Sequence, residues 1–321
     1  MTPRRALLAA PALLAVPARA QPAWPAERPI EVVVPFPPGG GVDIMTRAVL
    51  PFVQAQLPGA RFVVNNRGGA GGQVGNEATA NAAPDGYSIG AVSLPGFIAI
   101  PIERQVRYRP SEMTLIANVV DDPCALFVRA DSPWRTLADM VAAARARPDT
   151  VTYGTTGIGS DDHIMMVGFE ALTGTRFSHV PFTGMSQMFP QLLGGNIDLG
   201  AMNVSEALPL VREGRIRGLG QAGAERWSQM TGVPTFREQG HDVVASASRG
   251  FAGPGGLPAP IVQRLEAAFA AALTSPEFAR EAERLALPLK PLTGAAYRRF
   301  VLDQETALRR LWETRPWRER G

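Results

Sequence analysis

Short apolar runs alternate with amphipathic segments along most of the 321-residue chain. Runs such as Ile30–Val34 are rich in β-branched residues, which is typical of strands buried on both faces. Segments such as 42–56 and 136–147 place apolar residues at helical spacing, which predicts helices with one buried face. Because the two patterns follow one another at short spacing, we expect an α/β protein in which mainly parallel sheets are flanked by helices.

The pattern also predicts how the chain divides. Strands are predicted at 30–34, 62–64, 87–92, 115–120, 125–128, 151–153, 179–182, 197–202 and 216–220, with an extended segment at 243–253. Helices are predicted at 42–56, 75–83, 136–147, 161–173, 185–193, 205–213, 260–273, 276–285 and 295–313. A chain of this length usually forms more than one hydrophobic core, so we expect two domains. Hinge segments would cross between them near 126–129 and 248–253. Domain 1 would then be discontinuous, made of 21–126 plus 249–321, and domain 2 would be 127–248.

The first twenty residues have the pattern of a secretory signal peptide. Arg4 and Arg5 precede a short apolar run, and Ala18-Arg19-Ala20 is an A-x-A-type cleavage site. The run is too short to span a bilayer. We therefore expect export to the periplasm with cleavage after about Ala20, by the general route rather than by the twin-arginine route.

The charge of the mature chain argues against nucleic acid as a partner. The formal net charge is +3, and Arg4, Arg5 and Arg19 account for all of it because residues 1–20 contain no Asp or Glu. The mature chain is therefore formally neutral. The high pI of the full chain thus carries no argument for binding nucleic acid or an anionic membrane.

The residues that carry most enzyme chemistry do not form a recognisable motif. One cysteine, Cys124, and three scattered histidines exclude an internal disulfide and predict no metal site, and no motif predicts a cofactor. The glycine-rich runs match neither a dinucleotide fingerprint nor a phosphate loop, and there is no G-x-S-x-G elbow. Ser160, Asp161 and His163 are close in sequence, but Ser160 is better suited to cap a helix than to form a triad. We expect no enzyme activity; an exported α/β enzyme acting on a carboxylate is the alternative.

Two loops are more informative. Pro37-Pro38-Gly39-Gly40-Gly41 ends one predicted strand and opens a helix, and the segment 155–160 (TTGIGS) does the same in the second half. Helix N-termini present unpaired amides and a favourable dipole to an anion. Both loops lie at carboxyl ends of strands, where α/β sheets bind ligands. One such loop in each lobe predicts a small acid held in a cleft between the lobes.

An ordered set of motifs along the mature chain resembles the Bug/TctC family, the periplasmic solute-binding receptors of tripartite tricarboxylate transporters. The matching residues are Trp24-Pro25, Arg28-Pro29-Ile30, VPFPPGGG at 34–41 with Asp43, VNNRGGAGG at 64–72, APDGY at 83–87, GIGSDDH at 157–163, HVPFTG at 179–184, LLGGNID at 192–198, GVPT at 232–235, and Gly253-Pro254 before Leu257-Pro258. Each piece alone is unspecific, whereas the ordered set is specific.

The resemblance implies a two-lobed periplasmic binding protein of type II-like fold that closes on a small carboxylate, such as a di- or tricarboxylate, without chemistry. It implies that one carboxylate meets Thr156, Gly157 and Ser160, with Thr183 nearby, and that the first-lobe glycines face it. The ligand-binding set we expect is Phe36, Pro38, Gly39, Gly40, Gly41, Asp43, Thr156, Gly157, Ser160, Asp161, His163, Thr183, Gly184, Asn203 and Arg249.

The charged members of this set carry separate expectations. Asp43 is expected to cap its own helix, with a role in holding water left open. Asp161 and Asp162 are expected at a helix N-terminus facing outward, because an inward carboxylate would repel an acid; an inward Asp161 would favour a ligand amine. His163 is expected to pack structurally. Arg249 either lies on the surface or points into the cleft, where it could bind a further carboxylate bidentately.

The resemblance also implies partners. The ligand would be delivered to membrane components of a tripartite tricarboxylate transporter, and the receptor is expected to be a monomer. A ligand-sensing receptor for a membrane signalling protein is the remaining alternative.

Overall fold

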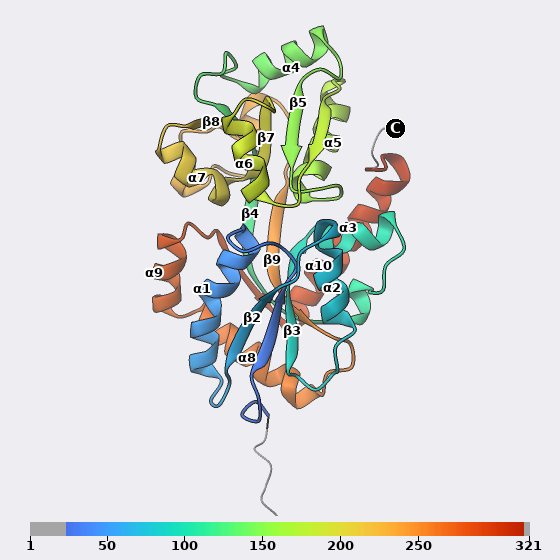
Figure 1. Ribbon diagram of the computed structural model, residues 1–321, viewed down its shortest axis with the longest axis vertical. Helices are drawn as coiled ribbons and strands as arrows, with labels where there is room; N and C mark the ends of the chain where they lie inside the picture. Colours follow the sequence, from blue (N-terminus) through green and yellow to red (C-terminus); the bar gives the residue numbers. More distant parts are fainter. Residues whose placement is uncertain (1–23, 318–321) are drawn as a thin grey trace, which may run out of the picture.

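The computed structural model describes residues 24–317, which form two groups of strands and helices joined in the middle by two long strands (Figure 1). The predicted signal peptide therefore lies outside the described residues. Each group is one lobe: we call the sheet containing β1 and its helices the first lobe, and the sheet containing β5 and its helices the second lobe. Among the described residues, no helix is both long enough and apolar enough to cross a membrane.

The first-lobe sheet combines parallel and antiparallel strands. β1 pairs in parallel with β2 and β3, whereas β9 runs antiparallel to both β3 and β4, and β10 runs antiparallel to β4. Its strands are β1 (Ile30–Val34), β2 (Phe62–Asn66), β3 (Ser88–Leu94), β4 (Thr114–Arg129), β9 (Ser246–Gly253) and β10 (Leu289–Thr293). The expected α/β fold is confirmed, but the expectation of mainly parallel sheets is wrong because β4 and β9 run against their neighbours.

Helices cover both faces of this sheet. Apolar side chains of β1 pack with those of α1, α8 and α9 on one face, while the other face packs against α3 and α10. The helices are α1 (Gly41–Gln56), α2 (Gln73–Ala80), α3 (Gly96–Glu103), α8 (Ala259–Leu273), α9 (Pro276–Arg284) and α10 (Gly294–Thr314). Helix α3 and strand β10 were not predicted. Seven of the eight residues of α3 are apolar or glycine, so no amphipathic period marks it.

The second lobe repeats this plan with a smaller sheet. β5 pairs in parallel with β6 and β7, and β4 runs antiparallel to β7 and β8. The strands are β5 (Thr152–Thr155), β6 (Ser178–Pro181), β7 (Leu199–Asn203) and β8 (Ile216–Gln221), and the helices are α4 (Leu137–Ala146), α5 (Asp161–Thr173), α6 (Met185–Leu193) and α7 (Val204–Arg212). One core joins the sheet to α4 and α5, and another joins it to α6 and α7.

Strand β4 belongs to both sheets. Its residues up to Pro123 pair with β9 in the first lobe, and from Cys124 onward they pair with β7 and β8 in the second. We expected two separate strands here, at 115–120 and 125–128. They are one 16-residue strand because Asp121, Asp122 and Pro123 continue the ladder with β9. Strands β1, β5 and β7 all have their carboxyl ends in the region between the lobes, where β4 crosses from one sheet to the other.

Candidate functional site

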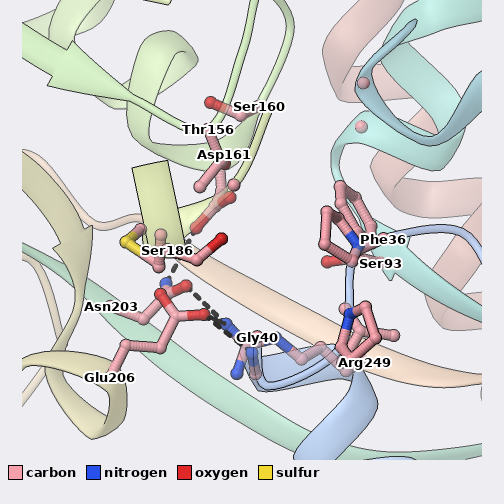
Figure 2. A pocket seen from close by; sticks show the side chains of 18 of the residues that line it. Phe36, Gly40, Ser93, Thr156, Ser160, Asp161, Ser186, Asn203, Glu206 and Arg249 are labelled. Carbon is pink, nitrogen blue, oxygen red and sulfur yellow. Dashed lines mark hydrogen bonds and ion pairs between the residues drawn. The ribbon is translucent and has the colours of Figure 1, made fainter. Parts of the chain in front are cut away.

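A cavity lies between the lobes where these strands end (Figure 2). It encloses about 680 Å³, including the space at its mouth that is open to solvent. Its lining residues are Phe36, Pro37, Pro38, Gly40, Gly41, Val42, Gly71, Ser93, Gly96, Thr156, Ile158, Ser160, Asp161, Gly184, Met185, Ser186, Asn203, Glu206 and Arg249. Ten of the fifteen residues that the sequence predicted therefore line one cavity, and they come from both lobes.

The first-lobe wall is the loop that joins β1 to α1. Asp43 does not line the cavity but holds this loop: its carboxylate accepts hydrogen bonds from the amide of Gly39 (2.9 Å), from Arg47 Nε (2.9 Å) and from Asn66 Nδ2 (2.9 Å). Burial alone would raise the pKa of Asp43, but these hydrogen bonds outweigh burial and lower it. Asp43 is therefore a charged anchor of the loop. It does not form the predicted cap of its own helix, because its carboxylate accepts the amide of Gly39, which precedes the helix.

The second-lobe wall is the loop that joins β5 to α5. Ser160 Oγ accepts a hydrogen bond from the amide of His163 (3.2 Å), which confirms that Ser160 caps the helix. His163 Nδ1 accepts from the amide of Gly159 (3.1 Å), and its ring stacks on His179 with centroids 4.2 Å apart. His163 thus supports the loop from behind, and Ser160 acts as the N-cap of α5.

Three further predicted residues do not line the cavity. Gly39 belongs to the exposed part of the first loop, and Thr183 is exposed and places its amide against Gln187 Oε1 (3.3 Å). Gly157 donates its amide to Thr155 Oγ1 (3.1 Å) and has φ +130°, a conformation that favours glycine. These residues shape the loops rather than the cavity surface.

Arg249 lines the cavity, but the carboxylates of Asp122 and Glu206 already pair with its guanidinium; Figure 2 shows Glu206 beside it. Nη1 donates to Asp122 Oδ2 (2.8 Å), and Nη2 donates to Asn203 Oδ1 (2.6 Å) and Glu206 Oε1 (3.3 Å). The Arg249 side chain is only 3 % exposed. Its guanidinium is therefore not free to bind a ligand carboxylate bidentately in this arrangement.

Glu206 was missed by the sequence analysis although it joins the two lobes. It lies in α7, and its Oε1 accepts the amide of Gly41 at the start of α1 (3.1 Å). A signal existed: Asn203 and Glu206 stand at N-cap and N3 of α7, the spacing of a capping box. Neither side chain caps α7, because Asn203 binds Arg249 and Glu206 binds Gly41.

Asp161 also lies differently from its predicted orientation. It faces the cavity instead of solvent, and its Oδ2 accepts hydrogen bonds from Asn203 Nδ2 (2.8 Å) and the Cys124 thiol (3.1 Å). The outward expectation is wrong because Asn203, at the end of β7, supplies a buried donor to this carboxylate. Asp162 is completely buried.

Burial and repulsion between acids change the protonation of Glu206 and Asp162. Burial raises the pKa of Glu206 to about 7, and repulsion by Asp122 and Asp161 adds to it, although Arg249 and the Gly41 amide oppose the shift. Burial, and then Asp161 and Glu206, raise the pKa of Asp162 well above its usual value. This end of the cavity thus carries carboxyl groups that hold their protons more strongly than usual, in contrast to the simple anion site that the sequence predicted.

Asp161 and Asp162 also bring carboxylate oxygens within 4.8 Å of the Cys124 sulfur, a grouping that could hold a metal ion. Burial, and then repulsion by both acids, raises the pKa of Cys124 well above its usual value. The sulfur therefore remains a thiol that donates to Asp161, whereas a metal ligand is a thiolate. The local chemistry favours a hydrogen-bonded thiol.

Two α/β lobes, shared crossing strands and a cavity between the carboxyl ends of strands define the class of two-lobed periplasmic binding proteins. The chain belongs to the TctC family, described as the tripartite tricarboxylate transporter family receptor, whose model matches residues 46–315. This is a family of solute-binding receptors rather than of enzymes. Its members are periplasmic, bind small carboxylates and work with membrane transporter components.

Individual relatives support this assignment. A Cupriavidus necator protein, "UPF0065 protein in gbd 5'region", is 31% identical over 299 residues, which cover 93% of this chain and 90% of that protein. The solved structure of the periplasmic binding protein BugD has a TM-score of 0.83 and 26% identity, covering 90% of this chain and 97% of BugD. The R. palustris protein Rpa4515, solved with adipate, has a TM-score of 0.82 and 28% identity, covering 91% of this chain and 98% of that one.

Proposed function

We propose that this protein captures a small carboxylate-bearing solute between its lobes and delivers it to a membrane transporter. The observation that carries the proposal is the cavity, whose opposite walls are the starts of α1 and α5. Helix starts stabilise anions, and the hydroxyls of Thr156 and Ser160 on the same wall add hydrogen-bond donors. The adipate in a related structure is consistent with this ligand class.

The crossing strands suggest how the cavity opens. We propose that domain 1 (21–126 plus 249–321) and domain 2 (127–248) turn about β4 and the segment leading into β9. Strand β4 changes sheets between Pro123 and Cys124, three residues before the proposed limit at 126, and β9 joins the first-lobe sheet from Ser246, three residues before the limit at 249. Both crossings lie beside the cavity. Two neighbouring antiparallel crossings allow a hinge motion without disrupting either core.

A thermal-shift screen tests the proposal. The mature chain starting at Gln21 would be screened against malate, succinate, adipate, citrate, aromatic acids and amino acids. A ligand that binds only the folded state at 100 times its Kd should stabilise it by about 2.7 kcal/mol. A Thr156→Val, Ser160→Ala variant should lose this response, whereas Thr274→Val, an exposed residue just after α8 that does not line the cavity, should keep it. No response to any member of the screen would contradict the proposal.

A further inference from the structure

The end of α10 reaches the second lobe without being part of the hinge. Tyr297, Val301 and Leu308 anchor the helix in the first lobe, where they are buried at a spacing that places them along one face. Figure 1 shows α10 running from the first lobe toward α5 of the second lobe. The segment after α10 therefore meets the second lobe again, although the chain left that lobe at β9.

Pro316 sets the direction of the chain after α10. Proline has no amide donor, and it disfavours the helical conformation of the residue before it. Arg315 accordingly leaves the helix with φ −148° and ψ 76°. We call residues 315–317 the strap. It brings the ring of Trp317 against that of Trp312, with centroids 4.8 Å apart.

Trp317 lies fully buried where the two lobes meet. It belongs to the core cluster of α3 and α10, against which Ile164 and Val167 of α5 pack from the second lobe. A Cβ added at Gly159 would lie 3.5 Å from Trp317 Nε1 and 3.7 Å from Ala99 Cβ. The loop that forms the second-lobe wall of the cavity therefore rests on α3 and on the strap.

The other two residues of the strap lie beside α5. Arg315 and Pro316 line one groove together with Val167, Glu170, Ala171 and Thr175. Opening about β4 and β9 would carry α5 away from α10, because α10 is packed into the first-lobe core. The contacts of the strap with α5 would thus be lost in an open protein.

The surroundings of Trp317 suit a contact that forms and breaks. Its Nε1 is buried and has no hydrogen-bond partner within residues 24–317. A buried donor without a partner costs free energy, which contact with water would recover, whereas burial of the indole rings is favourable. Apolar packing therefore holds the indole, and its release breaks no hydrogen bond of Nε1.

We propose that the strap is a latch that stabilises the closed arrangement of the lobes. Trp317, held by the first lobe, packs behind the loop 155–160 and is released when the cavity opens. This inference rests on the proposed hinge motion and adds a device that controls it. Because the same loop forms a wall of the cavity, binding in the cavity and seating of Trp317 favour one another by the same factor.

Single-molecule energy transfer between two dyes measures the latch. Ala142→Cys on α4 and Ala267→Cys on α8 place one dye on the exposed surface of each lobe. Cys124 is buried and is not labelled under native conditions. The test protein ends at Thr314 and so lacks the strap, and the matched control ends at Trp317.

A second control separates the latch from stability in general. Trp24 packs against the first-lobe core and donates Nε1 to Gly86 O (3.0 Å), so Trp24→Leu removes a tryptophan within one lobe. This variant should lower the melting temperature and leave the ratio of open to closed molecules unchanged.

Removal of the strap should raise the ratio of open to closed molecules about tenfold or more without any ligand. The same ratio in the chains that end at Thr314 and at Trp317 would overturn the inference. Malate, succinate, adipate and citrate, added to the dye-labelled full chain, test the hinge itself. If none of them shifts the transfer, the proposed function is contradicted, whereas a shift on removing the strap would still support the latch.

Hydrogen exchange keeps the inference testable if the shortened chain does not fold. Trp317→Leu reduces the seated side chain, and Val167→Ala trims the second-lobe side of the contact. Each should speed exchange about threefold or more in peptides covering 155–163, where the Gly159 amide is bound to His163 Nδ1. Peptides covering β1 should exchange as in the wild type. Wild-type exchange of 155–163 in both variants would also overturn the inference.

Discussion

The environment of Arg249 determines what that side chain can bind. On an exposed surface its fork of donors would suit a ligand carboxylate. Here Asp122, Asn203 and Glu206 occupy its Nη atoms, and the side chain is 3 % exposed. Arg249 therefore acts as an internal cation that makes it feasible to bury Asp122 and Glu206.

Replacing Arg249 should be strongly destabilising. Arg249→Met leaves Asp122, which is completely buried, without its cation. Breaking a buried ion pair by removing one partner typically costs about 3–5 kcal/mol. Urea unfolding would measure the loss. Arg299→Met is the control, because its ion pair with Asp303 is exposed at 3.8 Å, and such pairs contribute about 0–1 kcal/mol. Equal losses in the two variants would contradict the buried-pair interpretation.

At the scale of elements, α1 and α5 begin in different ways. The N-cap of α5 is Ser160, whose own side chain satisfies an amide of the first turn. The N-cap of α1 is Gly40, which has no side chain, and the amide of Gly41 is satisfied by Glu206 from the other lobe. The start of α1 is thus completed only when the second lobe lies against it.

Adjacent glycines at the start of α1 allow a matched test. A Cβ at Gly41 would lie 2.5 Å from Arg249 Nη1 and 2.7 Å from Glu206 Oε1. Because Asp122 and Asn203 hold that guanidinium in place, Gly41→Ala should cost about 1–3 kcal/mol, as overpacking usually does. A Cβ at Gly40 would meet nothing nearer than Pro37 O at 3.8 Å. Thermal unfolding should show that Gly40→Ala has a stability close to that of the wild type. If Gly41→Ala were equally mild, the side chains of Arg249 and Glu206 would be easily displaced.

At the scale of the whole molecule, contacts between lobes occur at the cavity and also beside α10. The buried Trp317 follows α10, and Ile164 and Val167 of α5 pack against the same first-lobe core. Figure 1 shows α10 running from the first lobe toward the second. Stability and lobe closure are therefore linked, and a group that bridges the lobes affects both.

The pH dependence of unfolding should reveal the ionisation of Glu206, the acid that bridges the two lobes. Its pKa is about 7 in the folded protein and near 4.5 when unfolded, so the folded state binds the extra proton between these values. Stability from this group therefore falls as pH rises from about 4.5 to about 7, by at most about 1.4 kcal/mol per pH unit, and levels off above.

Comparison with a variant isolates this contribution. Burial lowers the pKa of His179 from 6.5 to about 4. Its contribution therefore has the opposite sign: stability is lost as pH falls from about 6.5 to about 4. Urea unfolding of wild type and Glu206→Gln between pH 4.5 and 8.5 would therefore be compared as a difference, which cancels His179. Parallel curves for the two proteins would show that Glu206 does not titrate in this range.

Much of the architecture could be predicted because its signals are local. The two loops at 37–41 and 155–160 were identified from glycine and proline after buried strands, and both contribute to the cavity wall. Helix α5 and its Ser160 cap followed from residues three apart. Helix α3 was missed because an apolar run of eight residues has no period to indicate it.

The sequence by itself determined most of the strands and helices, the family and the placement of two glycine loops at strand ends, because these depend on residues near one another in the chain. Only the tertiary structure decided the charge of the cavity. Asp122 and Arg249 are 127 positions apart and meet at 2.8 Å, and Asp161 and Asn203, 42 positions apart, meet at 2.8 Å. The protonation and direction of a carboxylate depend on neighbours within a few ångströms, and here four elements from two lobes supply those neighbours.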